Sequence, residues 1–164
     1  MKAHFEMMAA YNAWANQRLY DAAFALSEEE YRRDCQLFFG SLHGTLNHLF
    51  VADVIWLARF RDQPNPPWRL DHIAHDRRED LQKRRVSLDR DIIGFTGALD
   101  EGRLASEFTY RTMVNNKLVT QELSAALAHF FNHQTHHRGQ CHAALTRLVG
   151  AAPAMDLAFF QREG

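Results

Sequence analysis

The chain has 164 residues, of which 46% are hydrophobic and 24% are charged, and this composition excludes a disordered chain. The formal net charge is −1 with histidine counted as neutral, so no basic excess indicates nucleic acid or an anionic membrane as a partner. We therefore expect a single domain over residues 1–164, large enough to bury one core.

Cysteine usage and the N-terminus indicate the compartment. Cys35 and Cys141 are far apart and form no CxxC motif, which is typical of a reducing environment and offers no zinc knuckle. The first residues lack the apolar run and cleavage site of a signal peptide. No uninterrupted run of about 18 apolar residues predicts a membrane span. The sequence therefore predicts a cytoplasmic protein with no membrane partner.

The first long helix is predicted over residues 4–26, where apolar residues recur at helical spacing without proline or glycine. Ser27 and Glu30 then form a capping-box pattern that opens a short helical turn through residue 33.

The second long helix is predicted over residues 42–60, after Gly40 and Ser41. It is apolar around almost its whole circumference, which is typical of a helix buried on all sides. In so small a protein we expect a second copy of the chain to cover the spare face, so the pattern predicts a homodimer.

The third long helix is predicted over residues 76–99, beyond a loop that contains three prolines. Its many charged residues indicate that one face is solvated. Residues 107–120 alternate in polarity and contain an Asn-Asn pair, which predicts a short hairpin. A fourth helix follows over residues 120–148 and is closed by Gly150.

The C-terminal tail, residues 153–162, carries an apolar patch of Leu157, Phe159 and Phe160, which we expect to dock on the helices. Four long helices with one crossover loop predict an all-α four-helix bundle with a short β-hairpin before the last helix.

Histidine is unusually frequent, with ten in the chain, and half of them lie within fourteen residues: His129, His133, His136, His137 and His142. Imidazole is a common metal ligand and titrates near neutral pH. This cluster is therefore the first place to look for chemistry.

The helical period places these histidines around the fourth helix. Relative to the apolar stripe, His137 lies about 40° to one side and His133 about 80° to the same side. His129 and His136 lie about 120° and 140° away, so both are expected to face solvent. His133 and His137 are separated by four residues, which lets two imidazoles reach one ion.

A third ligand must come from another helix, and His48 in the middle of the buried second helix is the natural candidate. Spacing alone leaves the question open. A lone histidine at the margin of a core is usually structural, His129 and His133 share the same spacing, and neither His43 nor His142 is excluded as a ligand.

Four segments resemble the DinB/YfiT-like family. HQTHHRGQ (133–140) is similar to its C-terminal motif, and SLHGTLNHLFVADVIWL (41–57) is similar to its second-helix signature. YNAWANQRLYDA (11–22) and DLAFF (156–160) resemble its looser end patterns. The resemblance therefore covers nearly the whole chain.

The resemblance implies a metal-binding triad on His48, His133 and His137. It also implies an up-down-down-up four-helix bundle that is often a homodimer. Many members of the family have no assigned reaction, whereas some relatives are metal-dependent thiol S-transferases.

Three neutral imidazoles leave a metal ion with an open coordination position, which is typical of a catalytic site. The reacting group would be a metal-bound water or the thiolate of a small thiol. Such a site suits several divalent transition metals, with zinc or nickel as our first candidates. Gln134 follows His133, so the HExxH motif of a zinc peptidase is missing.

Three residues near the ligands are candidates for a supporting role. Asp53 must be paired if it is buried, either with a ligand imidazole or with an arginine such as Arg138. Arg138 and Gln140 are interpreted as helix-packing and hydrogen-bonding residues. Trp56 is interpreted as core packing, and Gly139 is expected to allow a close approach of another segment.

Two functional hypotheses follow. The first is a metal-dependent enzyme, with thiol S-transferase or hydrolase-type chemistry in detoxification. The second is a metal-binding stress-response module without turnover. Direct DNA binding is disfavoured by the neutral charge and the lack of a recognition motif.

Overall fold

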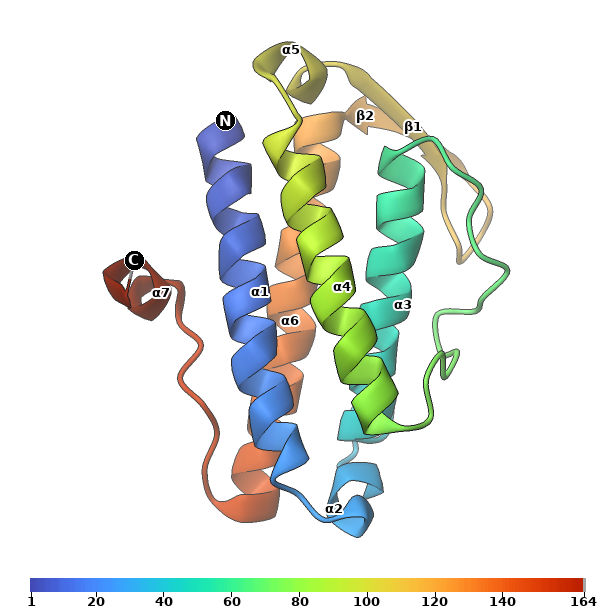
Figure 1. Cartoon of the computed structure of the whole chain (residues 1–164). Helices are drawn as coiled ribbons and strands as arrows, with labels where there is room; N and C mark the ends of the chain where they lie inside the picture. The colour runs from blue at the N-terminus through green and yellow to red at the C-terminus, as the bar shows by residue number, and fades with distance from the viewer. Residues whose placement is uncertain (164) are drawn as a thin grey trace.

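Four long helices run side by side in the computed structural model, which describes residues 1–163 (Figure 1). They are α1 (Lys2–Phe24), α3 (Leu42–Phe60), α4 (Arg78–Gly97) and α6 (Leu123–Val149). Both α1 and α3 contact α4 and α6, so the core lies between all four helices. Among residues 1–163, none of the helices has the length and apolar character needed to cross a membrane.

Four short elements lie near the ends of the long helices: α2 (Glu28–Arg32), α5 (Glu101–Leu104), β1 (Glu107–Arg111) and β2 (Leu118–Glu122). A fifth, α7 (Leu157–Glu163), lies beside the middle of α1 (Figure 1). The capping box between Ser27 and Glu30 is present and opens α2. The predicted hairpin is confirmed as an antiparallel pair in which Thr109 faces Thr120. Because Thr120 pairs in the sheet, α6 begins at Leu123 rather than near residue 120. The fold is thus mostly helical, with one small sheet.

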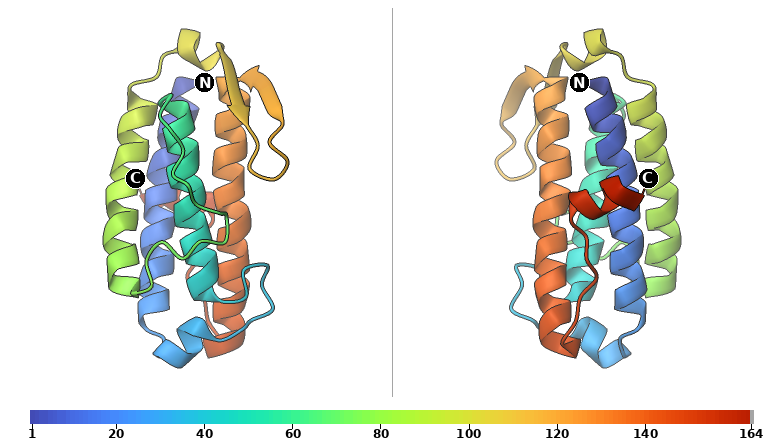
Figure 2. Two further views of the ribbon diagram at one scale, coloured as in Figure 1. Left: turned by 90° about the vertical axis from the view of Figure 1, so that its right-hand side faces the viewer. Right: turned by 90° about the vertical axis from the view of Figure 1, so that its left-hand side faces the viewer.

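Helix α3 is the most buried of the long helices, as its pattern predicted, with fifteen of its 19 residues buried. The expected reason for a second subunit is wrong, because the same chain covers the spare face. The segment 61–77 runs along α3 (Figure 2). Asn47 holds it by donating to the carbonyl oxygen of His75 and accepting from its backbone N–H. A homodimer stays a prediction, but α3 no longer supports it.

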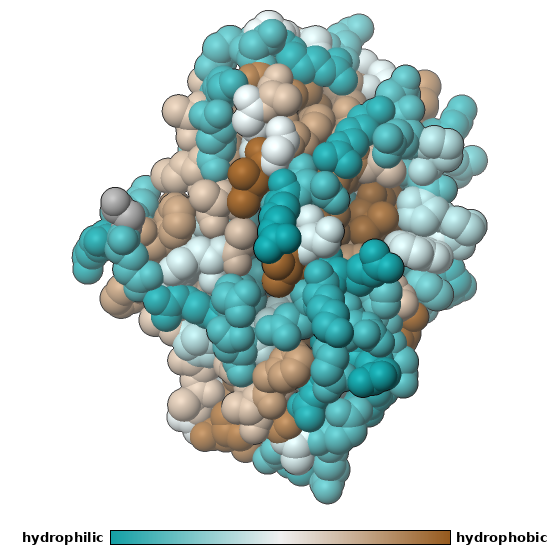
Figure 3. Space-filling model, viewed as in Figure 1, coloured by the Kyte–Doolittle hydropathy of each residue, from teal (hydrophilic) through white to brown (hydrophobic). Residues whose placement is uncertain are grey.

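Helix α4 is the most polar of the long helices, and hydrophilic side chains cover much of it on the face shown in Figure 3. The few side chains that it buries include the charged Arg85 and Asp89. The solvated face predicted for this helix is therefore confirmed, but its inner face is not purely apolar.

The C-terminal tail docks on α1, as predicted. Phe160 packs against Tyr11 and Trp14, with ring centroids 5.9 and 5.8 Å apart, and Glu163 accepts hydrogen bonds from Trp14 and Arg18. The apolar patch is only partly used, because Phe159 remains 44% exposed.

Candidate metal centre

Three imidazoles meet where α3 packs against α6. His48 comes from α3, and His133 and His137 come from successive turns of α6. One ligand atom from each ring lies within 4.8 Å of the other two, and the Nε2 atoms of His48 and His133 are 3.2 Å apart. Nitrogens bound to one tetrahedral ion at about 2.0–2.1 Å would be about 3.4 Å apart. Small side-chain rotations would therefore bring all three rings onto one ion.

The helical faces of α6 explain why these histidines and not their neighbours meet. His137 is 7% exposed and His133 is half-buried, whereas His129 and His136 are exposed. The predicted inward pair is therefore confirmed. His48 is 4% exposed because α3 is buried on nearly all sides.

Two of the three rings are oriented by hydrogen bonds at the nitrogen that faces away from the cluster. His48 Nδ1 donates to the carbonyl oxygen of Leu70 at 2.8 Å, and His137 Nδ1 donates to Oε1 of Gln140 at 2.9 Å. In these tautomers the proton is on Nδ1 and the lone pair is on Nε2, which is the arrangement that outer partners impose on metal-binding histidines.

Burial keeps the three rings neutral. It lowers the pKa of His48 to about 4, and burial followed by the neighbouring imidazoles lowers the pKa of His133 to about 3. Burial also lowers the pKa of His137, although the hydrogen bond to Gln140 opposes the shift. Only a neutral imidazole has a free lone pair, so the cluster is ready to bind a cation at pH 7.

Phe39 covers one side of the cluster. Its ring stacks on His48 at a centroid distance of 3.8 Å and an angle of 16°, and it lies 5.7 Å from the ring of His137. Neither this contact nor the hydrogen bond to the carbonyl oxygen of Leu70 could be predicted from the sequence, because both residues lie in loops outside any periodic pattern.

A cavity of about 260 Å³ opens beside His48 and His133. Trp56 and Arg59 line it further along α3, and Tyr110 lines it from β1. Trp56 is a buried core residue, as interpreted from the sequence, and it is also a wall of this cavity. A second cavity of about 440 Å³ lies between α1, α6 and the C-terminal tail, and no residue of the histidine cluster lines it.

Two of the candidate supporting residues lie away from the cluster. Asp53 Oδ2 accepts a hydrogen bond from Arg85 at 2.6 Å. Neither of the two partners expected for Asp53, a ligand imidazole or Arg138, is therefore the partner found. Five residues along a helix turn Asp53 about 140° away from His48. Arg138 donates to Asn12 in the core, because it is rotated about 100° from His137. Of the three candidates, Gln140 alone contacts a cluster histidine.

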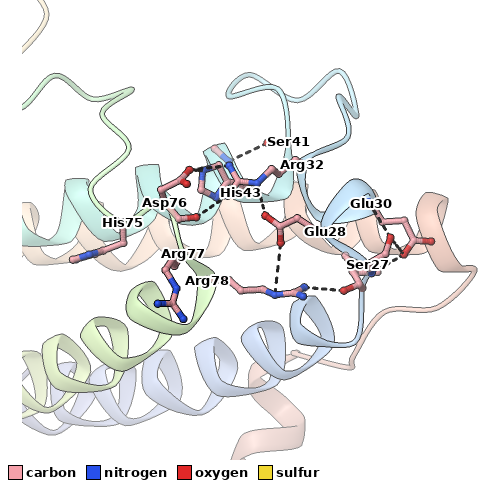
Figure 4. A network of polar contacts seen from close by, with 12 residues as sticks. Ser27, Glu28, Glu30, Arg32, Ser41, His43, His75, Asp76, Arg77 and Arg78 are labelled. Atoms are coloured by element: carbon pink, nitrogen blue, oxygen red, sulfur yellow. Dashed lines mark hydrogen bonds and ion pairs between the residues drawn. The ribbon is translucent and has the colours of Figure 1, made fainter.

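His43 and His142, which spacing did not exclude, do not join the cluster. The Nε2 atom of His43 lies 3.5 Å from Asp76, in a polar network that also contains Glu28 and Arg32 (Figure 4). This network ties α2 to the start of α3 and to Asp76, two residues before α4.

The expected role of Gly139 is wrong. A Cβ atom built at this residue would meet nothing within 4 Å, outside its own helix, so no other segment approaches closely. The residue lies on the exposed side of α6, where a side chain would be tolerated.

Comparison with known proteins agrees with the motifs. The model of the DinB family matches residues 1–163. The chain belongs to the DinB family. Protein DinB of Bacillus subtilis (strain 168) is 26% identical to it over 153 residues, which are 88% of this chain and 85% of that protein. The resemblance expected from four short segments is thus confirmed as DinB family membership over nearly the full length.

Proposed function

We propose that this DinB family protein binds one divalent transition metal through the Nε2 atoms of His48, His133 and His137. The observation that carries the proposal is the meeting of three neutral imidazoles, with one ligand atom of each within 4.8 Å of the others. The hydrogen bonds to Leu70 and Gln140 support it, because they leave Nε2 free on two of the rings.

The proposal includes the fold that positions these rings. We propose a single domain that is a four-helix bundle of up-down-down-up topology, in which α3 and α6 carry the ligands. Zinc and nickel are the first candidates for the ion, since three imidazoles suit both. A homodimer in the cytoplasm is also part of the proposal, and light scattering tests its oligomeric state.

We further propose that the site is catalytic. A bound ion would supply Lewis acidity and would lower the pKa of a water or thiol at its open position. The histidines hold the ion, Phe39 shields one side, and the cavity beside His48 and His133 offers a small molecule access to the other. This access favours a metal-dependent enzyme, with thiol S-transferase or hydrolase-type chemistry, over a closed metal-binding stress-response module.

Elemental analysis of purified protein tests metal binding. We expect about one transition metal per wild-type chain, and its loss in the His133→Ala variant. The matched control is His129→Ala, because His129 has the same four-residue spacing from His133 but is exposed. The proposal is overturned if wild-type protein binds no metal after incubation with zinc, nickel, manganese and iron, or if His129→Ala loses metal equally.

Turnover separates the enzyme from the binding module. Metal-loaded wild-type protein is expected to transfer a low-molecular-weight thiol to an electrophile, and His133→Ala is expected to be inactive. A protein that binds metal stoichiometrically but turns over neither a thiol acceptor nor an ester would be the stress-response module instead.

A further inference from the structure

The cavity beside the histidines follows one face of α3. His48, Ala52, Trp56 and Arg59 all line it, and their spacing of four, four and three residues places them on one side of the helix. The Cα rise from His48 to Arg59 is about 16 Å. The cavity therefore runs along α3 from the histidine cluster toward a cationic side chain.

The side chain of Arg59 has few hydrogen-bond partners. Its Nη2 donates to the carbonyl oxygen of Arg111 at 2.8 Å, but its Nε is buried and has no hydrogen-bond partner. No carboxylate within residues 1–163 forms an ion pair with it, whereas the buried Arg85 pairs with two. With one hydrogen bond, from Nη2, and no ion pair among residues 1–163, the guanidinium keeps N–H donors on its Nη atoms for an anion.

The walls next to Arg59 are aromatic and apolar. Its guanidinium carbon lies 5.0 Å from the ring centroid of Trp56 and 5.2 Å from that of Tyr110. The β1–β2 loop adds Met113 and Val114 to the cavity, and Val114 is 87% exposed. Apolar walls with a single well-placed charge are typical of sites for small organic ligands.

The size and charge of the cavity narrow the ligand class. One guanidinium offers one positive charge and a planar pair of donors, which matches a carboxylate. A volume of about 260 Å³ lies just below the usual range of about 300–1,000 Å³ for ligand sites, so the ligand must be small.

We propose that this cavity binds a small organic carboxylate with its charged group on Arg59, its apolar or aromatic body against Trp56 and Tyr110, and its other end at the three histidines. The inference rests on the proposed function only for what happens at that other end, where the reacting group would meet the ion. The recognition of the carboxylate needs no metal.

Calorimetric titration of metal-free protein tests the inference. The probes are phenylacetate, 3-phenylpropanoate and 4-phenylbutanoate, each compared with its neutral amide. We expect wild-type protein to bind at least one carboxylate about 10-fold or more tightly than its amide, because a charge-assisted hydrogen bond is lost with the amide. Arg59→Gln is expected to remove this preference, and Arg59→Lys is expected to keep part of it.

The matched control is Arg61→Gln, two residues further along the chain and exposed, which is expected to keep the preference. Thermal unfolding of each variant checks the fold, and Arg59→Lys carries the test if Arg59→Gln does not fold. No binding of any carboxylate at millimolar concentration, equal binding of carboxylate and amide, or equal loss in Arg61→Gln overturns the inference. Because the protein is metal-free, an absence of metal binding would overturn the proposed function alone.

Discussion

His48 shows how burial gives one side chain a chemical role. Its ring lies between Phe39 and the two histidines of α6, and its Nδ1 is already bonded to the carbonyl oxygen of Leu70. A positive charge on this imidazole would be poorly solvated, so burial lowers the pKa of His48 from its ordinary value of 6.5 to about 4. The site therefore keeps a lone pair free for a cation at neutral pH.

This pKa predicts how the stability of the metal-free protein depends on pH. Below pH 6.5 the unfolded chain binds a proton at His48 that the folded chain does not, so stability is full above 6.5 and falls toward pH 4. For His48 alone the loss at pH 5 is about 2 kcal/mol. Urea unfolding at pH 7 and pH 5 with a chelator present measures it.

The control is His48→Gln, whose amide can still donate to Leu70 but does not titrate. The acid-induced loss of unfolding free energy is expected to be smaller in this variant by the same amount. An identical pH dependence in both proteins would show that His48 is not held neutral by the fold.

At the scale of elements, the site depends on how the chain enters α3. Residues 33–41 form a turn that places Phe39 over His48. Gly44, in the first turn of α3, makes this possible, because a Cβ atom there would lie 2.2 Å from the carbonyl oxygen of Phe39. Because Gly44 has no side chain, the backbone of Phe39 can lie against α3, and the ring of Phe39 can cover one side of the histidine cluster.

Two glycine substitutions test this packing. Gly44→Ala is expected to lower the free energy of unfolding by about 1–3 kcal/mol, because backbone must move, and to weaken zinc binding by displacing Phe39. Gly139→Ala meets no neighbour and is expected to be stabilising by up to about 1 kcal/mol. Chemical denaturation and zinc titration measure both effects. Equal stability of the two variants would contradict the close approach at Gly44.

At the scale of the whole molecule, a buried polar network joins all four long helices. Arg85 of α4 pairs with Asp53 of α3 at 2.6 Å and with Asp89 at 2.8 Å. Asp89 accepts from Asn16 of α1, and Arg138 of α6 contacts the same asparagine. The two arginines and two aspartates balance in charge. Apolar stripes tolerate several packings, whereas these contacts are satisfied only when the helices keep their order.

Breaking this network predicts a large loss of stability. Asp53→Ala would leave Arg85 with one carboxylate fewer in the core, and we expect the free energy of unfolding to fall by about 3–5 kcal/mol. The comparison is Asp76→Ala, which breaks the ion pair between Asp76 and Arg32; the side chain of Asp76 is 75% exposed. That change is expected to cost less than about 1 kcal/mol. Urea denaturation of both variants measures the difference, and similar costs would argue against the network as a determinant of packing.

Local patterns were sufficient to predict the four long helices, the hairpin and the faces of α6 on which His129, His133, His136 and His137 lie. Periodicity fixes the direction of a side chain around its own helix, so His133 and His137 were expected to point inward and His129 outward. The bounds of α3 were predicted because serine before it and prolines after it are local signals. The segments that resemble the DinB family carried the choice of His48 as the third residue of the cluster.

Contacts between elements were decided by the tertiary structure. The sequence determined that Asp53 needed a partner, but the packing of α3 against α4 made that partner Arg85. It determined that α3 is apolar all round, but the segment 61–77 covers its spare face. The cavity that joins the histidines to Arg59 was likewise beyond prediction, because its walls come from α3, α6 and the hairpin. Periodicity encodes a direction for each side chain, whereas which distant side chain it meets depends on how all the helices pack together.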